Sequence, residues 1–177
     1  MLCRLVVPCA LVALASAAAS AQSRVDAEIA IHLKVLSFDR SLVSKARKPL
    51  RVAVVHRPAA LPRGVLKAFT TLARRGLTVH RRPVQVRAVP LTGNWRRLLL
   101  RQADVVFVAG DIGNELGQII ALKLPTLCRT LAQVRRGVAV GVVGSAGRPR
   151  IVINVAAARA ARMRIDPKLL RLATLIR

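Results

Sequence analysis

Apolar residues follow two different periods along this chain. Short β-branched runs are typical of strands, and longer segments whose apolar positions recur every three or four residues are typical of helices. The strand-like runs are 51–55, 84–89 and 104–109, and the helical segments are 65–76, 94–102 and 114–124. Strands that alternate with helices of this length require crossovers, so they form a parallel sheet covered on both faces. The pattern predicts a Rossmann-like three-layer α/β domain with a mainly parallel sheet.

The segments before and after this alternation complete the predicted fold. Apolar spacing predicts a first helix over 26–42. The runs 138–143 and 150–155 are both strand-like, and the connection between them is too short for a crossover helix. They therefore predict a C-terminal antiparallel hairpin. Two terminal helices are expected after it, one over 156–163 and one from Asp166 to Ile176, where Asp166-Pro167 matches a helix cap.

The first 21 residues have the pattern of a cleavable secretory signal peptide. Arg4 precedes an apolar stretch, Leu5–Ala19, which is shorter than the roughly 20 residues of a membrane-spanning helix. The stretch ends at Ala19-Ser20-Ala21, the small-x-small pattern of a cleavage site. We therefore predict cleavage after Ala21, export to the periplasm, and a mature chain, 22–177, that folds as a single domain and has no membrane-spanning segment.

Export also determines what the cysteines can do. Cys3 and Cys9 leave with the signal peptide, so Cys128 remains alone and no disulfide can form within the mature chain. Cys128 lies in a short predicted strand, 126–130, where a small buried thiol is the expected role. No histidine or other base lies beside it in the sequence to activate it as a nucleophile.

The chain is strongly basic. Its net charge is +24, with 31 Lys and Arg against 7 Asp and Glu, and Arg4 is the only charge lost with the signal peptide. Such a surface attracts anionic partners. Nucleic acid is nevertheless not the expected partner, because the chain has no Tyr, one Trp and three Phe and so lacks the aromatic residues that stack on bases.

No motif of a known catalytic, cofactor or metal site is present. Gly141, Gly144 and Gly147 resemble a phosphate-binding loop, but a strand follows them where such a loop requires a helix, so a turn explains them better. The three histidines are far apart and lack the spacing of metal ligands. We therefore expect a protein that is not an enzyme and that uses no cofactor or metal.

If a ligand site exists, the fold predicts its place. Ligands of open α/β sheets bind outside the carboxyl ends of the strands. His56 ends the first predicted strand, and Gly110 and Asp111 follow the third, so these three residues are the candidate rim of a ligand or partner site. The alternatives are that His56 only ends its strand and that Asp111 caps the next helix.

The C-terminal segment resembles the YfiR-like family. The resemblance rests on Arg150-Ile-Val-Ile-Asn-Val-Ala-Ala-Ala-Arg159 and on Ile165-Asp-Pro-Lys-Leu-Leu-Arg-Leu-Ala173. In that family a strand ending in Ile-Asn leads into a helix of Ala and Arg, and a Leu-rich helix follows. Asn154 and Arg159 match the motif, and we expect them to be structural positions.

The resemblance implies a small periplasmic regulator without enzymatic activity. The best understood members of the family repress a membrane-bound diguanylate cyclase by binding its periplasmic sensor region, which links the cell envelope to cyclic-di-GMP and biofilm formation. Two departures are notable, since this chain lacks the cysteine pairs of the redox-responsive members and is unusually basic. The charge predicts an acidic surface on the membrane-bound partner. There are two alternative functions: a periplasmic protein that binds a small ligand or an anionic surface, and an unrecognised enzyme. A homodimer is the alternative for the state of assembly.

Overall fold

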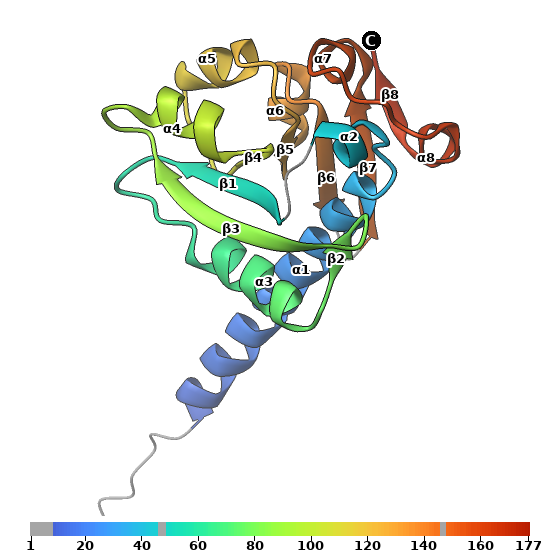
Figure 1. Ribbon diagram of the computed structural model, residues 1–177. Coiled ribbons are helices and arrows are strands. Elements are labelled where there is room, and N and C mark those ends of the chain that lie inside the picture. The colour runs from blue at the N-terminus through green and yellow to red at the C-terminus, as the bar shows by residue number, and fades with distance from the viewer. Residues whose placement is uncertain (1–8, 46–48, 146–147) are drawn as a thin grey trace, which may run out of the picture.

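One eight-stranded sheet with helices on both faces forms the molecule (Figure 1). The structure is a computed structural model that describes residues 9–45, 49–145 and 148–177. The strand order is β2-β3-β1-β4-β5-β6-β7-β8. The strands are β1 (Leu50–His56), β2 (Thr78–Val79), β3 (Arg82–Pro90), β4 (Val105–Val108), β5 (Thr126–Cys128), β6 (Val140–Ser145), β7 (Arg148–Asn154) and β8 (Thr174–Ile176).

The middle of the sheet is parallel, as the alternating pattern predicts. β1 pairs with β3 on one side and with β4 on the other, and β5 and β6 extend the parallel block beyond β4. β1 and β4 are buried on both faces, which explains why their sequences are continuous apolar runs. The hairpin of β6 and β7 is antiparallel. The predicted mixed α/β fold, with a mainly parallel sheet and a C-terminal antiparallel hairpin, is therefore confirmed.

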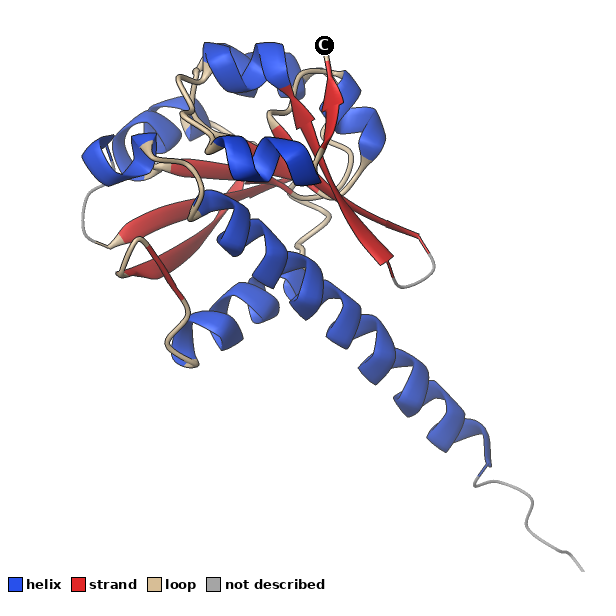
Figure 2. Cartoon of the chain, turned by 90° about the vertical axis from the view of Figure 1, so that its right-hand side faces the viewer, coloured by secondary structure: helices blue, strands red, loops and turns tan. Residues whose placement is uncertain are grey.

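Helices cover the two faces of the sheet as separate layers (Figure 2). One layer packs α1, α3, α7 and α8 around Phe69, Phe107 and Ile153. The other packs α4, α5 and α6 around Trp95, Val106 and Ile119. The helices are α1 (Cys9–Leu36), α2 (Ser41–Lys45), α3 (Arg63–Arg74), α4 (Trp95–Gln102), α5 (Glu115–Ala121), α6 (Leu131–Arg135), α7 (Val155–Ala160) and α8 (Pro167–Leu172).

The first predicted helix differs from α1 at both ends. α1 begins at Cys9 instead of residue 26, so it continues through the predicted cleavage site after Ala21. α1 ends at Leu36, not at residue 42, and a separate short helix, α2, begins at Ser41. Asp39 is buried between them, and its Oδ1 accepts hydrogen bonds from the backbone N–H groups of Ser41 and Arg164. This contact with a segment far along the chain bends the backbone, and no local pattern could indicate it.

The last predicted helix is also too long. Asp166 caps α8 as expected, because its carboxylate accepts from the N–H of Lys168. The helix ends at Leu172, however, and residues 174–176 form β8, which pairs in parallel with β7. Pairing with the sheet edge thus outweighs the helical pattern of the apolar residues that reach Ile176.

The glycines of the hairpin have a different role from the predicted one. Gly141 and Gly144 lie within β6, not in a turn, and Gly147 lies outside the described residues. A Cβ on Gly141 would stand 2.5 Å from a methyl group of Val134, so glycine there lets α6 pack closely on β6.

Within the described residues, no helix combines the length and the apolar character needed to cross a membrane.

Candidate functional site

The parallel strands place one edge of the sheet where ligands of α/β proteins bind. From β1 the chain passes through α3 to β3 on one side, and then through α4 back to β4 on the other side of β1. The loops after β1 and β4 therefore leave the sheet in different directions, which opens a crevice at the carboxyl ends of these strands.

A cavity of about 300 Å³ lies beside this switch point. α1 and α3 contribute its apolar wall, and the ends of β4 and β5 together with α6 contribute most of its polar groups. The lining residues are Val25, Pro62, Gly64, Val65, Val108, Ala109, Gly110, Arg129, Thr130 and Gln133.

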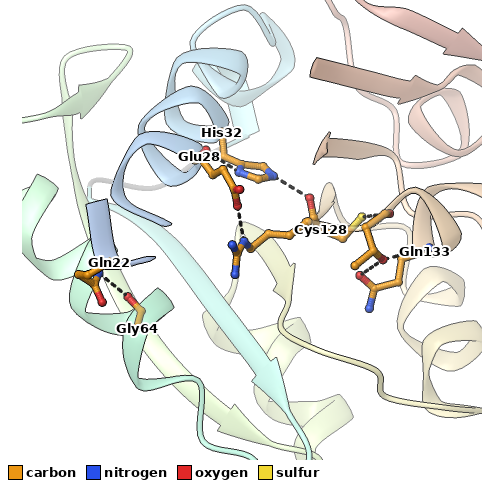
Figure 3. Close-up of polar contacts among 8 residues, drawn as sticks. Gln22, Glu28, His32, Gly64, Cys128 and Gln133 are labelled. Atoms are coloured by element: carbon orange, nitrogen blue, oxygen red, sulfur yellow. Dashed lines mark hydrogen bonds and ion pairs between the residues drawn. The ribbon is translucent and has the colours of Figure 1, made fainter. Parts of the chain in front are cut away.

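Two side chains of α1 hold the helix against β5 at this cavity (Figure 3). Glu28 forms an ion pair with Nε of Arg129, the residue that follows β5. His32, one turn further along α1, is fully buried, and its Nε2 lies 2.8 Å from the carbonyl oxygen of Cys128. The ion pair and the histidine contact both bridge residues about a hundred positions apart in the sequence, so the helix and strand form one wall.

The buried position of His32 sets its charge. Burial lowers the pKa of His32 to about 4, whereas its contacts with the carbonyl oxygens of Cys128 and Glu28 act in the opposite direction. The second of these carbonyl oxygens, that of Glu28, lies 2.8 Å from Nδ1. A neutral imidazole carries one N–H, so at neutral pH the ring donates to one of the two carbonyl groups.

A second set of hydrogen bonds fixes the far wall of the cavity. The hydroxyl of Thr130 caps α6 by accepting from the N–H of Gln133 and donates to the side-chain oxygen of the same residue. The amide of Gln133 then donates to the carbonyl oxygen of Gly110 at 2.6 Å. The loop after β4 is thus tied to α6. On the α3 side, Gln22 donates to the carbonyl oxygen of Gly64 (Figure 3).

The predicted rim residues differ in their surroundings. Gly110 lines the cavity with a φ of 76°, a conformation that glycine adopts without strain. His56 ends β1, is buried, and has no hydrogen-bond partner at Nε2. Asp111 is exposed outside the cavity, and it accepts from the N–H of Gly113 instead of capping α5. That hydrogen bond, with the charges of Arg57 and Arg136, lowers the pKa of Asp111.

The motif positions Asn154 and Arg159 lie away from the cavity, at the end of the sheet where the parallel strands begin. β7 runs antiparallel to β6, so its last residue, Asn154, stands beside Ala139, before the first residue of β6. The Asn154 side chain caps α7 through the N–H of Ala157 and donates to the carbonyl oxygen of Val134. Arg159 is exposed in the last turn of α7.

Most polar groups of the cavity were not among the predicted residues. Arg129 and Thr130 follow β5 directly, so the strand-end rule that selected Gly110 also applies to them. Glu28 and His32 share one face of α1 at a spacing of four residues. Their contact with β5 depends on how α1 packs on the sheet, and nothing near them in the sequence indicates it.

The thiol of Cys128, the residue before Arg129, is buried. Burial raises the pKa of the Cys128 thiol to about 12, so at neutral pH it is in the protonated, weakly nucleophilic form. In the described ranges, no three His, Cys, Asp or Glu side chains are grouped as metal ligands. Arg129, whose Nε is paired with Glu28, lines a cavity with an apolar wall, and a guanidinium in such a place suits a small molecule with an anionic group.

Solved structures of low sequence identity share this fold. The ABC domain from Streptococcus pneumonia, solved in complex with L-Trp, aligns with a TM-score of 0.55 at 16% identity, over 80% of this chain and 60% of that one. A ligand-free, open substrate-binding protein with adhesive properties from Clostridium difficile aligns with a TM-score of 0.54 at 12% identity, over 77% and 57%. This chain thus spans less than two thirds of either structure, and the similarity concerns the fold alone.

Sequence comparison identifies the family. Among curated proteins, none matches this chain. The family described as YfiR/HmsC-like matches residues 27–174, from the first helix to the beginning of β8. This family comprises periplasmic, non-enzymatic regulators of diguanylate cyclase signalling. Because the match covers most of the chain and nearly the whole sheet, the chain belongs to the YfiR/HmsC-like family.

Proposed function

We propose that this protein is a periplasmic regulator that binds the periplasmic sensor region of a membrane-bound signalling protein. A diguanylate cyclase is the first candidate for that protein. The family match over residues 27–174 is the observation that carries this proposal. The net charge of +24 supports a partner with an acidic periplasmic surface. The regulator itself performs no catalysis and requires no cofactor or metal.

The proposal includes export. Residues 1–21 act as a signal peptide that is removed after Ala21, and the mature chain, 22–177, is the regulatory domain. Gln22, Glu28 and His32, which connect α1 to α3 and β5, all lie in the part of the chain that remains after this cleavage. N-terminal sequencing of the protein recovered from the periplasm should therefore begin at Gln22.

A genetic experiment tests the regulatory role. Deleting the gene should raise cellular cyclic-di-GMP and biofilm formation, because an inhibitor of the cyclase is lost. The full chain should restore the low level, whereas the chain without residues 1–21 should not, since it remains in the cytoplasm. Unchanged cyclic-di-GMP in the deletion strain would contradict the proposal.

The cavity supports a second candidate function, the binding of a small ligand. Its apolar wall, and Arg129 beside it, suit a small carboxylate such as an amino acid. Gly64→Leu should fill part of the cavity, whereas Gly117→Leu adds the same side chain to an exposed helix position with open space around it. A thermal shift with amino acids, L-tryptophan included, that Gly64→Leu abolishes and Gly117→Leu retains would favour ligand binding.

A third alternative, a homodimer, concerns assembly. Sedimentation of the mature chain at increasing concentration distinguishes a monomer from a dimer.

A further inference from the structure

The outer side of β3 is an open edge of the sheet. β2 pairs only with Arg82 and Pro83, at the beginning of β3. From Val84 to Pro90 the strand pairs with β1 on its inner side, and no other strand in the described part of the chain pairs with its outer side. In Figure 1, β3 accordingly runs along the outside of the sheet, with the short β2 beyond one end.

The backbone groups at this edge can be assigned from the pairing. Leu91 donates its N–H to the carbonyl oxygen of His56 on the β1 side. Peptide groups of successive residues point to opposite sides of a strand, so the N–H and C=O groups of Val84, Val86 and Ala88 point outward. These groups form a row that a further strand could pair with.

The side chains next to this row form two different surfaces. Val84 and Val86 belong to the apolar layer with α1 and α3. Gln85 and Arg87 point to the other face, where β1, β3 and α4 line a hollow of about 400 Å³. Arg87 donates there to the side chain of Gln102. An added strand would therefore have an apolar neighbour on one face and a polar, cationic neighbour on the other.

Charge determines which strand could pair here. Between Arg40 and Ala103 the sequence contains no Asp or Glu, and Arg82 and Arg87 lie on β3 itself. A second copy of this chain would place arginine opposite arginine, which is unfavourable. An acidic segment has the opposite charge and meets no such barrier.

We propose that the outer edge of β3 receives an extended, acidic segment of a partner protein as an added strand. The added backbone pairs with Val84, Val86 and Ala88, and its acidic side chains face Arg87 and the hollow, while its apolar side chains face Val84 and Val86. This mode of binding takes its affinity from backbone hydrogen bonds and its selectivity from alternate side chains. The inference rests on the proposed function, since it names where the partner docks.

A labelled peptide of about nine residues that alternates Glu and Val is the probe, because it matches the two surfaces of an extended strand. Fluorescence anisotropy with the mature chain should show binding that weakens as salt is added. A peptide of the same sequence, N-methylated at every second residue, loses one row of backbone donors and should bind at least tenfold more weakly. The same peptide with Lys in place of Glu should not bind.

Two protein variants locate the binding site. Ala88→Pro removes an outward N–H without touching the β1 ladder, and proline is tolerated at such edge positions. Ala88→Val retains that N–H and is the matched control. Arg87→Glu reverses the charge, and Arg171→Glu makes the same change at an exposed site on α8. Ala88→Pro and Arg87→Glu should each weaken binding at least tenfold, and the two controls should not.

The outcomes separate this inference from the proposed function. No binding of the Glu-Val peptide up to about 1 mM, or equal binding by all four variants, overturns the docking site. If Ala88→Pro fails to fold, binding by Arg87→Glu and binding of the N-methylated peptide show whether the outer edge of β3 is the docking site. The same variants are then tested against the partner's periplasmic region. Unchanged binding to that region would move the docking site elsewhere on the protein and leave the regulatory function intact.

Discussion

The crevice at the carboxyl ends of β4 and β5 and the outer edge of β3 are both polar, but their polar groups have different partners. In the crevice, Glu28, His32 and Gln133 contact Arg129, the Cys128 carbonyl and the Gly110 carbonyl within the molecule. At the edge, the backbone groups of Val84, Val86 and Ala88 lack a strand partner in the described chain. The crevice is therefore a region that holds the fold together, and the edge is a region that can still form bonds.

This difference predicts different consequences of mutation. A change in the crevice removes contacts that join α1 to the sheet, so it should lower the free energy of unfolding. A change at the β3 edge removes no internal contact of comparable size, so it should affect partner binding and leave stability nearly unchanged.

Phe107→Ala should destabilise the protein most. Phe107 is fully buried in β4, and its ring packs edge to face on His32 at 5.2 Å and on Phe69 at 5.4 Å between centroids. Removing it leaves a cavity beneath α1 and should lower the free energy of unfolding by about 3–5 kcal/mol. Urea unfolding monitored by circular dichroism measures this. A loss below about 1 kcal/mol would show that α1 does not pack there as described.

Acid should destabilise the crevice through His32. Its pKa of about 4 in the folded protein lies below the 6.5 of a free histidine, so the unfolded chain binds the proton more tightly. The contribution of neutral His32 is complete above pH 6.5 and decreases as the pH falls toward 4, by up to about 3 kcal/mol in all. His32→Gln removes this titration, so its unfolding free energy should depend less on pH over that range. Equal pH dependence of the two proteins would contradict the buried, neutral ring.

The ion pair of Glu28 and Arg129 should contribute less to the free energy of unfolding than the neutral His32 does. Both side chains are partly exposed, at 15% and 35%, so water and salt screen their attraction. A double-mutant cycle with Glu28→Gln and Arg129→Gln should give a coupling energy of about 0.2–1 kcal/mol at low salt, decreasing as salt is added. A coupling energy of zero at low salt would mean that the pair does not join α1 to β5.

Arg87→Glu should have the smallest effect on stability. Arg87 is exposed on β3, and its hydrogen bond to Gln102 is between surface side chains. The free energy of unfolding should change by less than about 0.5 kcal/mol, while binding of an acidic strand should weaken strongly. A large loss of stability without loss of binding would mean that Arg87 holds the fold together and does not contact the partner.

The sequence predicted those elements whose pattern is local. β1 and β4 are continuous apolar runs because both of their faces are buried, and the middle of β3 alternates because only one of its faces packs on the apolar layer of α1 and α3. Both patterns can be read without tertiary information. The hairpin of β6 and β7 followed from the length of its connection. Asp166 caps α8 as its position before proline indicated.

What the sequence did not predict depends on contacts between distant segments. Asp39 ends α1 through Arg164, and β8 exists only because β7 offers an edge for Thr174 to pair with. At the candidate site, the strand-end rule led to Gly110 but not to Glu28 or His32, whose role arises from the packing of α1 on β5. The open edge of β3 was equally hidden, because it follows from the strand order and the two-residue length of β2.

Direct binding to a membrane partner is the most decisive measurement. Isothermal titration should pair residues 22–177 with the periplasmic region of a candidate membrane-bound diguanylate cyclase from the same organism. We expect a complex that weakens as salt increases, that survives Arg171→Glu and that is at least tenfold weaker with Ala88→Pro. No heat of binding at concentrations of about 0.1 mM, at low salt, would mean that this chain is not a regulator acting through protein contact.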